Sequence, residues 1–163
     1  MIGNDVIDLS VARLESNIYR KNYLQKILTH QELSELQRRL DPEIHFWLLW
    51  SMKESAYKSF NRSSGIRLYN PSSFECYPDE NGLEGIVRFG PEIFFCRTAI
   101  NLDYIETFGC ENEKLISEIK SAEGLTINKI NDYPYIEFAD AKIAIASLSH
   151  HGRFTRAVYL PDS

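Results

Sequence analysis

The sequence predicts an α+β fold in which a long central helix packs on an antiparallel sheet. Helix-capping signals gather before residue 65, and apolar, strand-like runs separated by turn residues follow it. No segment repeats along the chain. With 163 residues, of which 44% are hydrophobic and 12% aromatic, the chain can bury a core as a single domain spanning residues 1–163.

The first part of the chain predicts one strand followed by helices. Ile2–Asp8 is expected to form a short strand that ends in acids. Thr29 precedes Glu32 by three residues, a capping box that predicts a helix over residues 29–40. Asp41 can cap a second helix over residues 42–60, with Pro42 in its first turn.

The second part predicts mainly strands. Apolar runs between turn residues place strands at residues 73–77, 85–89, 93–99, 104–108, 142–149 and 154–160. Residues 150–153 read as a hairpin tip between the last two strands. An amphipathic pattern predicts a helix over residues 111–122.

Charge and cysteine usage narrow the function classes. A net charge of −5 argues against a broad nucleic-acid-binding face. No apolar run approaches the roughly 20 residues needed to span a membrane, and the N-terminus lacks the pattern of a secretory signal. Cys76, Cys96 and Cys110 have no CxxC spacing, which favours reduced thiols in a cytoplasmic protein.

Three charged residues interrupt the apolar segment FWLLWSMKESAYKSF. Glu54 and Lys58 are four residues apart and share one helix face, whereas Lys53 precedes them. In one interpretation they form a surface ion pair, worth roughly 0.3–0.5 kcal/mol. In the other, Glu54 is a metal ligand and the lysines meet an anionic group.

The N-terminal segment IGNDVIDL adds two more acids. Gly3 would let another backbone or a ligand approach closely. Mg²⁺ prefers one or two carboxylates together with phosphate oxygens and water, a set that Asp5 and Glu54 could supply. Asp8 has a structural alternative, as the cap of a helix starting at Ser10.

The segment ASLSHHGRF carries hydroxyl, imidazole and guanidinium groups where a strand meets a turn. These groups could donate hydrogen bonds to a phosphate. An ordinary hairpin tip is the alternative. A Ser-His nucleophile pair has less support, because no GxSxG elbow surrounds either serine.

Together these motifs resemble the 4′-phosphopantetheinyl transferase superfamily, in its single-domain holo-acyl-carrier-protein synthase type. The matching residues are Gly3-Asn4-Asp5, Trp50 with Lys53, Glu54 and Lys58, and Ser149-His150. Asp8, three positions after Asp5, matches the short type of the family rather than the two-copy type. The loop ending in Gly65 is also similar to the family.

The resemblance implies transfer of the phosphopantetheine arm of coenzyme A to a serine of an apo acyl carrier protein, leaving adenosine 3′,5′-bisphosphate. It implies that Asp5 and Glu54 hold Mg²⁺ and that Lys58 neutralises phosphate charge. Ser149 and His150 would touch the nucleotide end. Lys53 would assist with phosphate or pack against a partner copy, and Gly65 would lie in the cofactor-binding loop. Either Glu54 or a metal-bound water would take the serine proton.

Family sites lie between two copies of the fold, so the resemblance implies a homo-oligomer, with a trimer as the first expectation. The Ser-His turn of one chain would then face the Asp5/Glu54 cluster of another. The stretch 94–135 is longer than the short type requires. Two alternatives remain: a catalytically silent carrier-binding scaffold, and an unrelated metal-dependent hydrolase.

The carrier proteins that such transferases modify are usually acidic, so a basic docking face is expected. Such residues gather in the early helices: Arg13, Arg20, Lys21 and Lys26. We expect them to steer docking through long-range attraction. The alternative is an ordinary solvated helical face.

Overall fold

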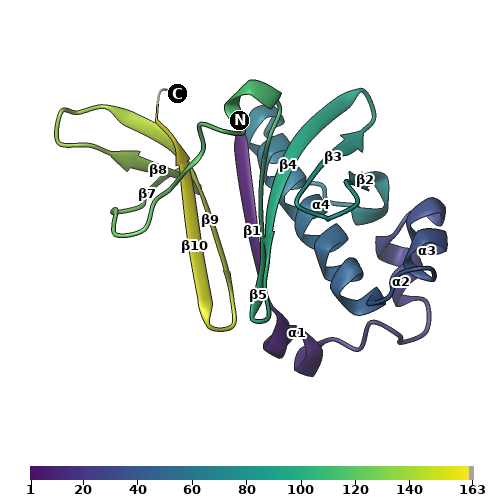
Figure 1. Ribbon diagram of the computed structural model, residues 1–163. Helices are drawn as coiled ribbons and strands as arrows, with labels where there is room; N and C mark the ends of the chain where they lie inside the picture. Colours follow the sequence, from purple (N-terminus) through teal and green to yellow (C-terminus); the bar gives the residue numbers. More distant parts are fainter. Residues whose placement is uncertain (162–163) are drawn as a thin grey trace.

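The computed structural model describes residues 1–161 and contains two five-stranded antiparallel sheets (Figure 1). The first sheet has the strand order β1-β5-β4-β3-β2. Its strands are β1 (Ile2–Asp8), β2 (Glu75–Pro78), β3 (Glu84–Phe89), β4 (Glu92–Ile100) and β5 (Tyr104–Cys110). These five strands confirm the antiparallel sheet expected from the sequence. The single-domain prediction extends to residues 162–163, which lie outside the described residues, and it stays a prediction.

The second sheet has the order β6-β10-β9-β8-β7. Its strands are β6 (Lys120–Ser121), β7 (Asn128–Ile130), β8 (Tyr133–Glu137), β9 (Ile143–His151) and β10 (Phe154–Leu160). The hairpin β9–β10 confirms the turn predicted at residues 150–153, and it lies beside β1 (Figure 1). β1 is therefore the edge strand of the first sheet that faces the second sheet.

The helices are α1 (Leu9–Glu15), α2 (Tyr23–Ile27), α3 (His30–Leu36) and α4 (Pro42–Ser64). The capping box at Thr29 and Glu32 is confirmed, and Asp41 caps α4 by accepting a hydrogen bond from the Ile44 amide at 3.0 Å. α4 runs four residues past the predicted end. It stops at Gly65, whose φ of 72° suits a residue without a side chain. Within residues 1–161, none of the helices has the length and apolar character needed to cross a membrane.

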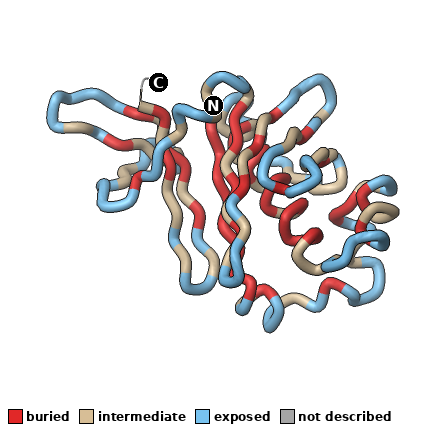
Figure 2. The backbone as a smooth tube through the Cα atoms, viewed as in Figure 1, coloured by how far each residue is buried: buried red, intermediate tan, exposed pale blue. Residues whose placement is uncertain are grey.

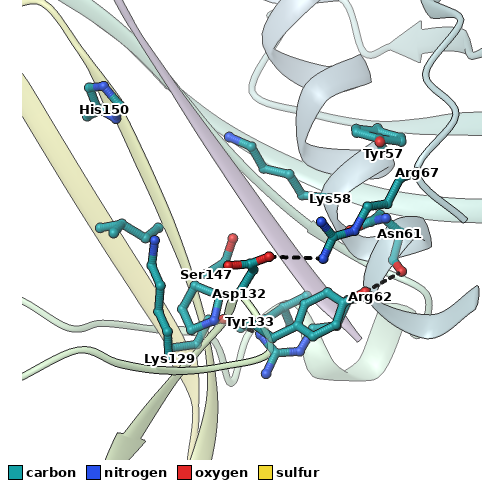
Figure 3. Close-up of a pocket in the computed structure, with 14 residues that line it drawn as sticks. Tyr57, Lys58, Asn61, Arg62, Arg67, Lys129, Asp132, Tyr133, Ser147 and His150 are labelled. Atoms are coloured by element: carbon teal, nitrogen blue, oxygen red, sulfur yellow. Dashed lines mark hydrogen bonds and ion pairs between the residues drawn. The ribbon is translucent and has the colours of Figure 1, made fainter. Parts of the chain in front are cut away.

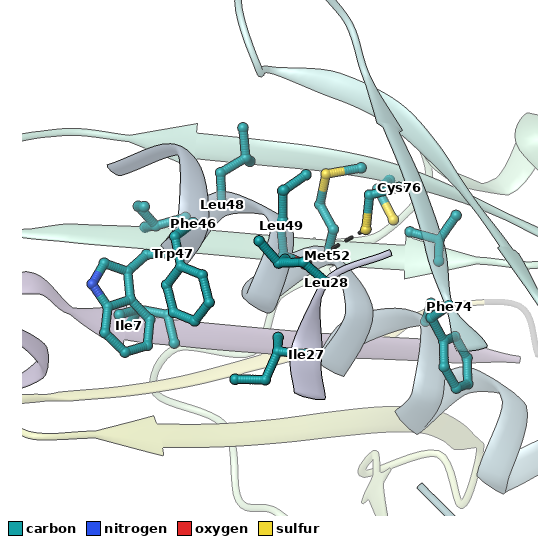
Figure 4. Packing of buried hydrophobic residues seen from close by; sticks show 14 of the residues in the cluster. Ile7, Ile27, Leu28, Phe46, Trp47, Leu48, Leu49, Met52, Phe74 and Cys76 are labelled. Carbon is teal, nitrogen blue, oxygen red and sulfur yellow. Dashed lines mark hydrogen bonds between the residues drawn. The ribbon is translucent and has the colours of Figure 1, made fainter. Parts of the chain in front are cut away.

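The main core forms where α4 packs on the first sheet. Phe46, Leu49 and Met52 of α4 are fully buried there, together with Phe74 (Figures 2 and 4). Gly3 allows α4 and β1 to come this close, because a Cβ at this position would lie 2.1 Å from the Ser55 carbonyl oxygen. The close approach brings the polar groups of α4 next to those of β1.

The prediction of a helix over residues 111–122 is wrong. Only a short 3₁₀ turn, Glu113–Leu115, forms there, and Lys120–Ser121 then pairs with β10 as an edge strand. The apolar residues that suggested a helix pack against Ile2 and Val158 between the sheets. Long-range packing and strand pairing therefore override the local periodicity.

Candidate functional site

The polar stripe of α4 meets β1 at Asp5. The Lys58 ammonium donates to Asp5 Oδ1 at 3.0 Å and to the Asn4 carbonyl oxygen at 2.7 Å. Asp5 and Glu54 line the same cavity, which has a volume of about 250 Å³. The structure thus brings together three of the residues that sequence analysis selected: Asp5, Glu54 and Lys58.

Burial gives both carboxylates an unusual protonation equilibrium. Desolvation raises the pKa of Asp5, while the neighbouring Lys58 opposes this shift. Desolvation also raises the pKa of Glu54, to about 7, and the negative charge of Asp5 contributes in the same direction. Two desolvated carboxylates with one ammonium group form a site that an additional cation would stabilise.

The donor set fits a magnesium ion. Asp5 Oδ2 is buried and has no hydrogen-bond partner among the described residues, so it is free to ligate a cation. Residues 1–161 contain no group of three or more His, Cys, Asp or Glu side chains arranged to hold a metal. Two carboxylates completed by substrate phosphates and water match the preference of Mg²⁺ better than that of metals that need a full protein cage.

The Ser-His segment reaches this cavity from the same chain. His150 and His151, at the end of β9, line the cavity beside Asp5 and Glu54. His151 Nδ1 accepts a hydrogen bond from the Asp8 amide at 2.9 Å. The sequence-based prediction placed the Ser-His turn and the acids on different copies. In the structure they meet within one chain, because β9 lies along β1.

A second, basic cavity of about 390 Å³ shares His150 with the cavity of Asp5 and Glu54. Lys58, which donates to Asp5, also lines this second cavity (Figure 3). Arg62 and Arg67 line it from α4 and the loop that follows, and Lys129 lines it from β7. Sequence analysis did not select these three residues. Arg62 lies one helical turn after Lys58, a spacing that could have indicated it. Nothing near Lys129 in the sequence marks it.

Lys53 does not lie in either cavity, which corrects the expectation that it contacts phosphate or a partner copy. Its side chain is 0% exposed, and its ammonium donates to Glu32 Oε1 at 2.9 Å and Oε2 at 2.8 Å. It also donates to the carbonyl oxygens of Pro71 and Phe74. Lys53 therefore joins α4 to α3 and to the segment before β2.

Ser149 and Gly65 also lie outside the lining of these two cavities. The Ser149 hydroxyl is buried against β1 and accepts a hydrogen bond from Asn4 Nδ2 at 2.9 Å. Gly65 ends α4. The structural interpretation of Asp8 is confirmed: it caps α1 through the Ser10 amide at 3.1 Å, and it also forms an ion pair with Arg153 at 2.8 Å.

Comparisons with known proteins identify the same family as the sequence motifs. The model of the 4′-phosphopantetheinyl transferase superfamily matches residues 1–110. A holo-[acyl-carrier-protein] synthase of Fusobacterium nucleatum is 29% identical over 86 residues, which are 53% of this chain and 67% of that protein.

Solved structures share the fold at low sequence identity. The Helicobacter pylori holo-[acyl-carrier-protein] synthase, in complex with coenzyme A, aligns with a TM-score of 0.53 at 9% identity, over 69% of this chain and 100% of that chain. The Thermotoga maritima holo-[acyl-carrier-protein] synthase aligns with a TM-score of 0.52 at 8% identity, over 97% of this chain and 81% of that chain. At these identities the structures establish likeness of fold alone.

Proposed function

Because the chain belongs to the 4′-phosphopantetheinyl transferase superfamily, we propose that it transfers the 4′-phosphopantetheine arm of coenzyme A to a serine of an apo acyl carrier protein. The products are the holo carrier protein and adenosine 3′,5′-bisphosphate. The observation that carries this proposal is the junction of the Asp5–Glu54–Lys58 cluster with a basic cavity lined by Arg62 and Lys129. The related synthase from Fusobacterium nucleatum supports the same reaction class.

The basic cavity suits the anionic donor. Its cationic side chains would bind the phosphates of coenzyme A, and Lys58 would place the pyrophosphate next to Asp5 and Glu54. His150, which lines both cavities, would contact the donor between the two sites. Most of the catalysis in phosphoryl transfer comes from such positioning and charge stabilisation.

In the proposed reaction the carrier serine oxygen attacks the phosphorus that bears the pantetheine arm. A new P–O bond forms, the pyrophosphate P–O bond breaks, and the nucleotide leaves with the charge. Lys58 stabilises charge on the phosphate oxygens. Glu54 accepts the serine proton, directly or through a water molecule.

We propose that Asp5 and Glu54 hold Mg²⁺. Bound there, the ion would supply Lewis-acid stabilisation of the charge that develops on the phosphate oxygens. The buried, unpartnered Asp5 Oδ2 supports this assignment. We place the reaction in the cytoplasm, with a carrier of fatty-acid synthesis as the first candidate, and the three free thiols at Cys76, Cys96 and Cys110 suit a reducing compartment. Association into a homo-oligomer, with a trimer first, stays a prediction that sedimentation can measure.

The test is to incubate the protein with coenzyme A, Mg²⁺ and an apo acyl carrier protein, and to weigh the carrier by intact mass spectrometry. We expect a mass gain of one phosphopantetheine arm, lost with a chelator and reduced at least about 100-fold in Asp5→Asn and Glu54→Gln. A carrier-binding scaffold would bind the carrier without changing its mass. A hydrolase would release product without a carrier, and either result would contradict the proposal.

A further inference from the structure

We propose that each copy of this chain holds a complete donor site, with the second wall supplied in cis by residues 111–161. This inference rests on the proposed function, because it concerns the same site. It states that turnover needs no side chain from a second copy, whatever the oligomeric state of the protein.

The two walls come from different parts of the chain. The first wall lies within residues 1–110, the part that the family model matches, and carries Asp5, Glu54 and Lys58. The second wall follows it: β9 contributes His150, and β7 contributes Lys129 (Figure 3). The segment beyond the family match is therefore part of the site rather than a remote extension.

Buried hydrogen bonds fix the second wall on β1. The Asn4 backbone amide donates to Ser147 Oγ at 3.0 Å. The Asn4 side-chain Nδ2 donates to Ser149 Oγ at 2.9 Å and to the Arg156 carbonyl oxygen at 3.0 Å. Asn4 directly precedes Asp5 on β1. Asn4 thus ties the strand that carries His150 to the strand that carries Asp5.

Further contacts cross the basic cavity itself. The Arg62 guanidinium donates to the Ala146 carbonyl oxygen at 2.5 Å, and the Tyr133 hydroxyl donates to the Asn61 carbonyl oxygen at 3.3 Å. Both contacts join the last turns of α4 to the second sheet. The cavity is therefore closed on two sides by one chain.

The hairpin β9–β10 lies against β1, beside the hairpin β4–β5 (Figure 1). β4 and β9 have nine residues each, and β5 and β10 have seven each, so the two hairpins have matching lengths. Their tips pack together, with the Tyr104 and Phe154 ring centroids 4.9 Å apart. Arg156 pairs with Glu106 across them at 3.2 Å. No hairpin from another copy could lie against β1 without displacing this one.

The test is complementation between two defective variants. Lys58→Met damages the first wall, and the double variant Lys129→Met/His150→Ala damages the second. The two are co-expressed with different affinity tags, purified through both tags and assayed for carrier modification. A site built in cis gives no more activity than the two variants alone. A site shared between copies restores about one wild-type site in two in a dimer, or about one in three in a trimer, which would overturn the proposal.

Controls make each outcome decisive. Wild type co-expressed with the variant that carries all three substitutions, and purified through both tags, should keep about half of the activity if sites lie in cis. If sites are shared, it should keep none in a dimer and about one sixth in a trimer. If the two tags do not co-purify, transfer by the wild-type monomer supports the proposal directly. If Lys129→Met/His150→Ala turns over like wild type with an unchanged coenzyme A KM, the second wall is not part of the site and the proposal fails.

A failure of the proposed function is recognised separately. If the wild type modifies no carrier, binding of adenosine 3′,5′-bisphosphate replaces turnover as the readout in the same samples. Binding sites that reappear when the two variants are combined would overturn the cis arrangement. Continued absence of binding in the combined sample, with wild-type binding intact, would support it. Circular dichroism confirms that each variant is folded.

Discussion

Lys53 and Lys58 lie five residues apart on α4, and they meet different partners. At 3.6 residues per turn this separation rotates their side chains by about 140° around the helix. Lys53 points to Glu32 in the core, whereas Lys58 points to Asp5 at the edge of the cavity. The sequence predicts that both lysines are unusual on so apolar a helix. It does not reveal that Glu32, which it marks only as a capping residue, is the partner of Lys53.

We expect Lys53→Met to lower the free energy of unfolding by about 3–5 kcal/mol, because it leaves the Glu32 carboxylate buried without its cation. Urea denaturation measures the loss. Lys58→Met, on the same helix, is the matched control. Lys58 is partly exposed whereas Lys53 is fully buried, so the loss of Lys58 should lower stability less than the loss of Lys53 and should remove most of the transferase activity. A stable Lys53→Met variant with a raised coenzyme A KM would instead return Lys53 to the binding site.

Among the elements, the hairpin β9–β10 carries an ion pair at its tip, between Arg153 and Asp8. Arg153 donates to Asp8 Oδ2 through its backbone amide at 2.9 Å and through Nε at 2.8 Å, and Asp8 also caps α1. These contacts tie the hairpin tip to the end of β1. The hydrogen bonds from Arg153 hold the pKa of Asp8 well below its ordinary value of 3.8.

This ion pair predicts a specific loss of stability in acid. A carboxylate with a lowered folded-state pKa stabilises the fold fully above its ordinary pKa, and the contribution is lost as pH falls below 3.8 towards the lowered value. We expect the free energy of unfolding of the wild type to fall in this range. Arg153→Met should be less stable at pH 7 and should show a shallower decline, measured by urea denaturation from pH 7 to pH 2.5. Parallel curves for the two proteins would show that Arg153 does not set the pKa of Asp8.

Most elements could be predicted because their signals are local. The capping residues Thr29 and Asp41 lie next to the helices they start, and strand runs carry their own apolar pattern. The short edge strand β6 could not be predicted, because its stability comes from pairing with β10 about 40 residues later. The same reason hides Lys129, whose place in the basic cavity depends on how the second sheet lies against α4.

At the scale of the whole molecule, β1 is the shared element of both halves. It pairs with β5 in the first sheet and packs beside β9 of the second, so it is buried along its full length (Figures 1 and 2). Sequence analysis predicted the acids of this strand and the Ser-His segment as parts of one site. The family resemblance placed them on separate copies, and nothing local to either segment specifies which strand will lie against β1.

The charge distribution of the molecule leads to a last prediction, on carrier docking. The chain has a net charge of −5, yet Arg20 and Lys21 are exposed between Ser16 and Tyr23, two residues that line the cavity of Asp5 and Glu54. An acidic carrier docked there would bring its serine towards Glu54. We expect Arg20→Glu/Lys21→Glu to raise the carrier KM by about 10-fold at low salt, and the effect should shrink as salt screens the attraction. The coenzyme A KM should not change.

Arg38→Glu/Arg39→Glu is the matched control, since it changes the net charge equally at exposed residues that do not line the cavity of Asp5 and Glu54. Equal effects of the two double variants would mean that overall charge, and not a docking surface beside α2, governs carrier binding.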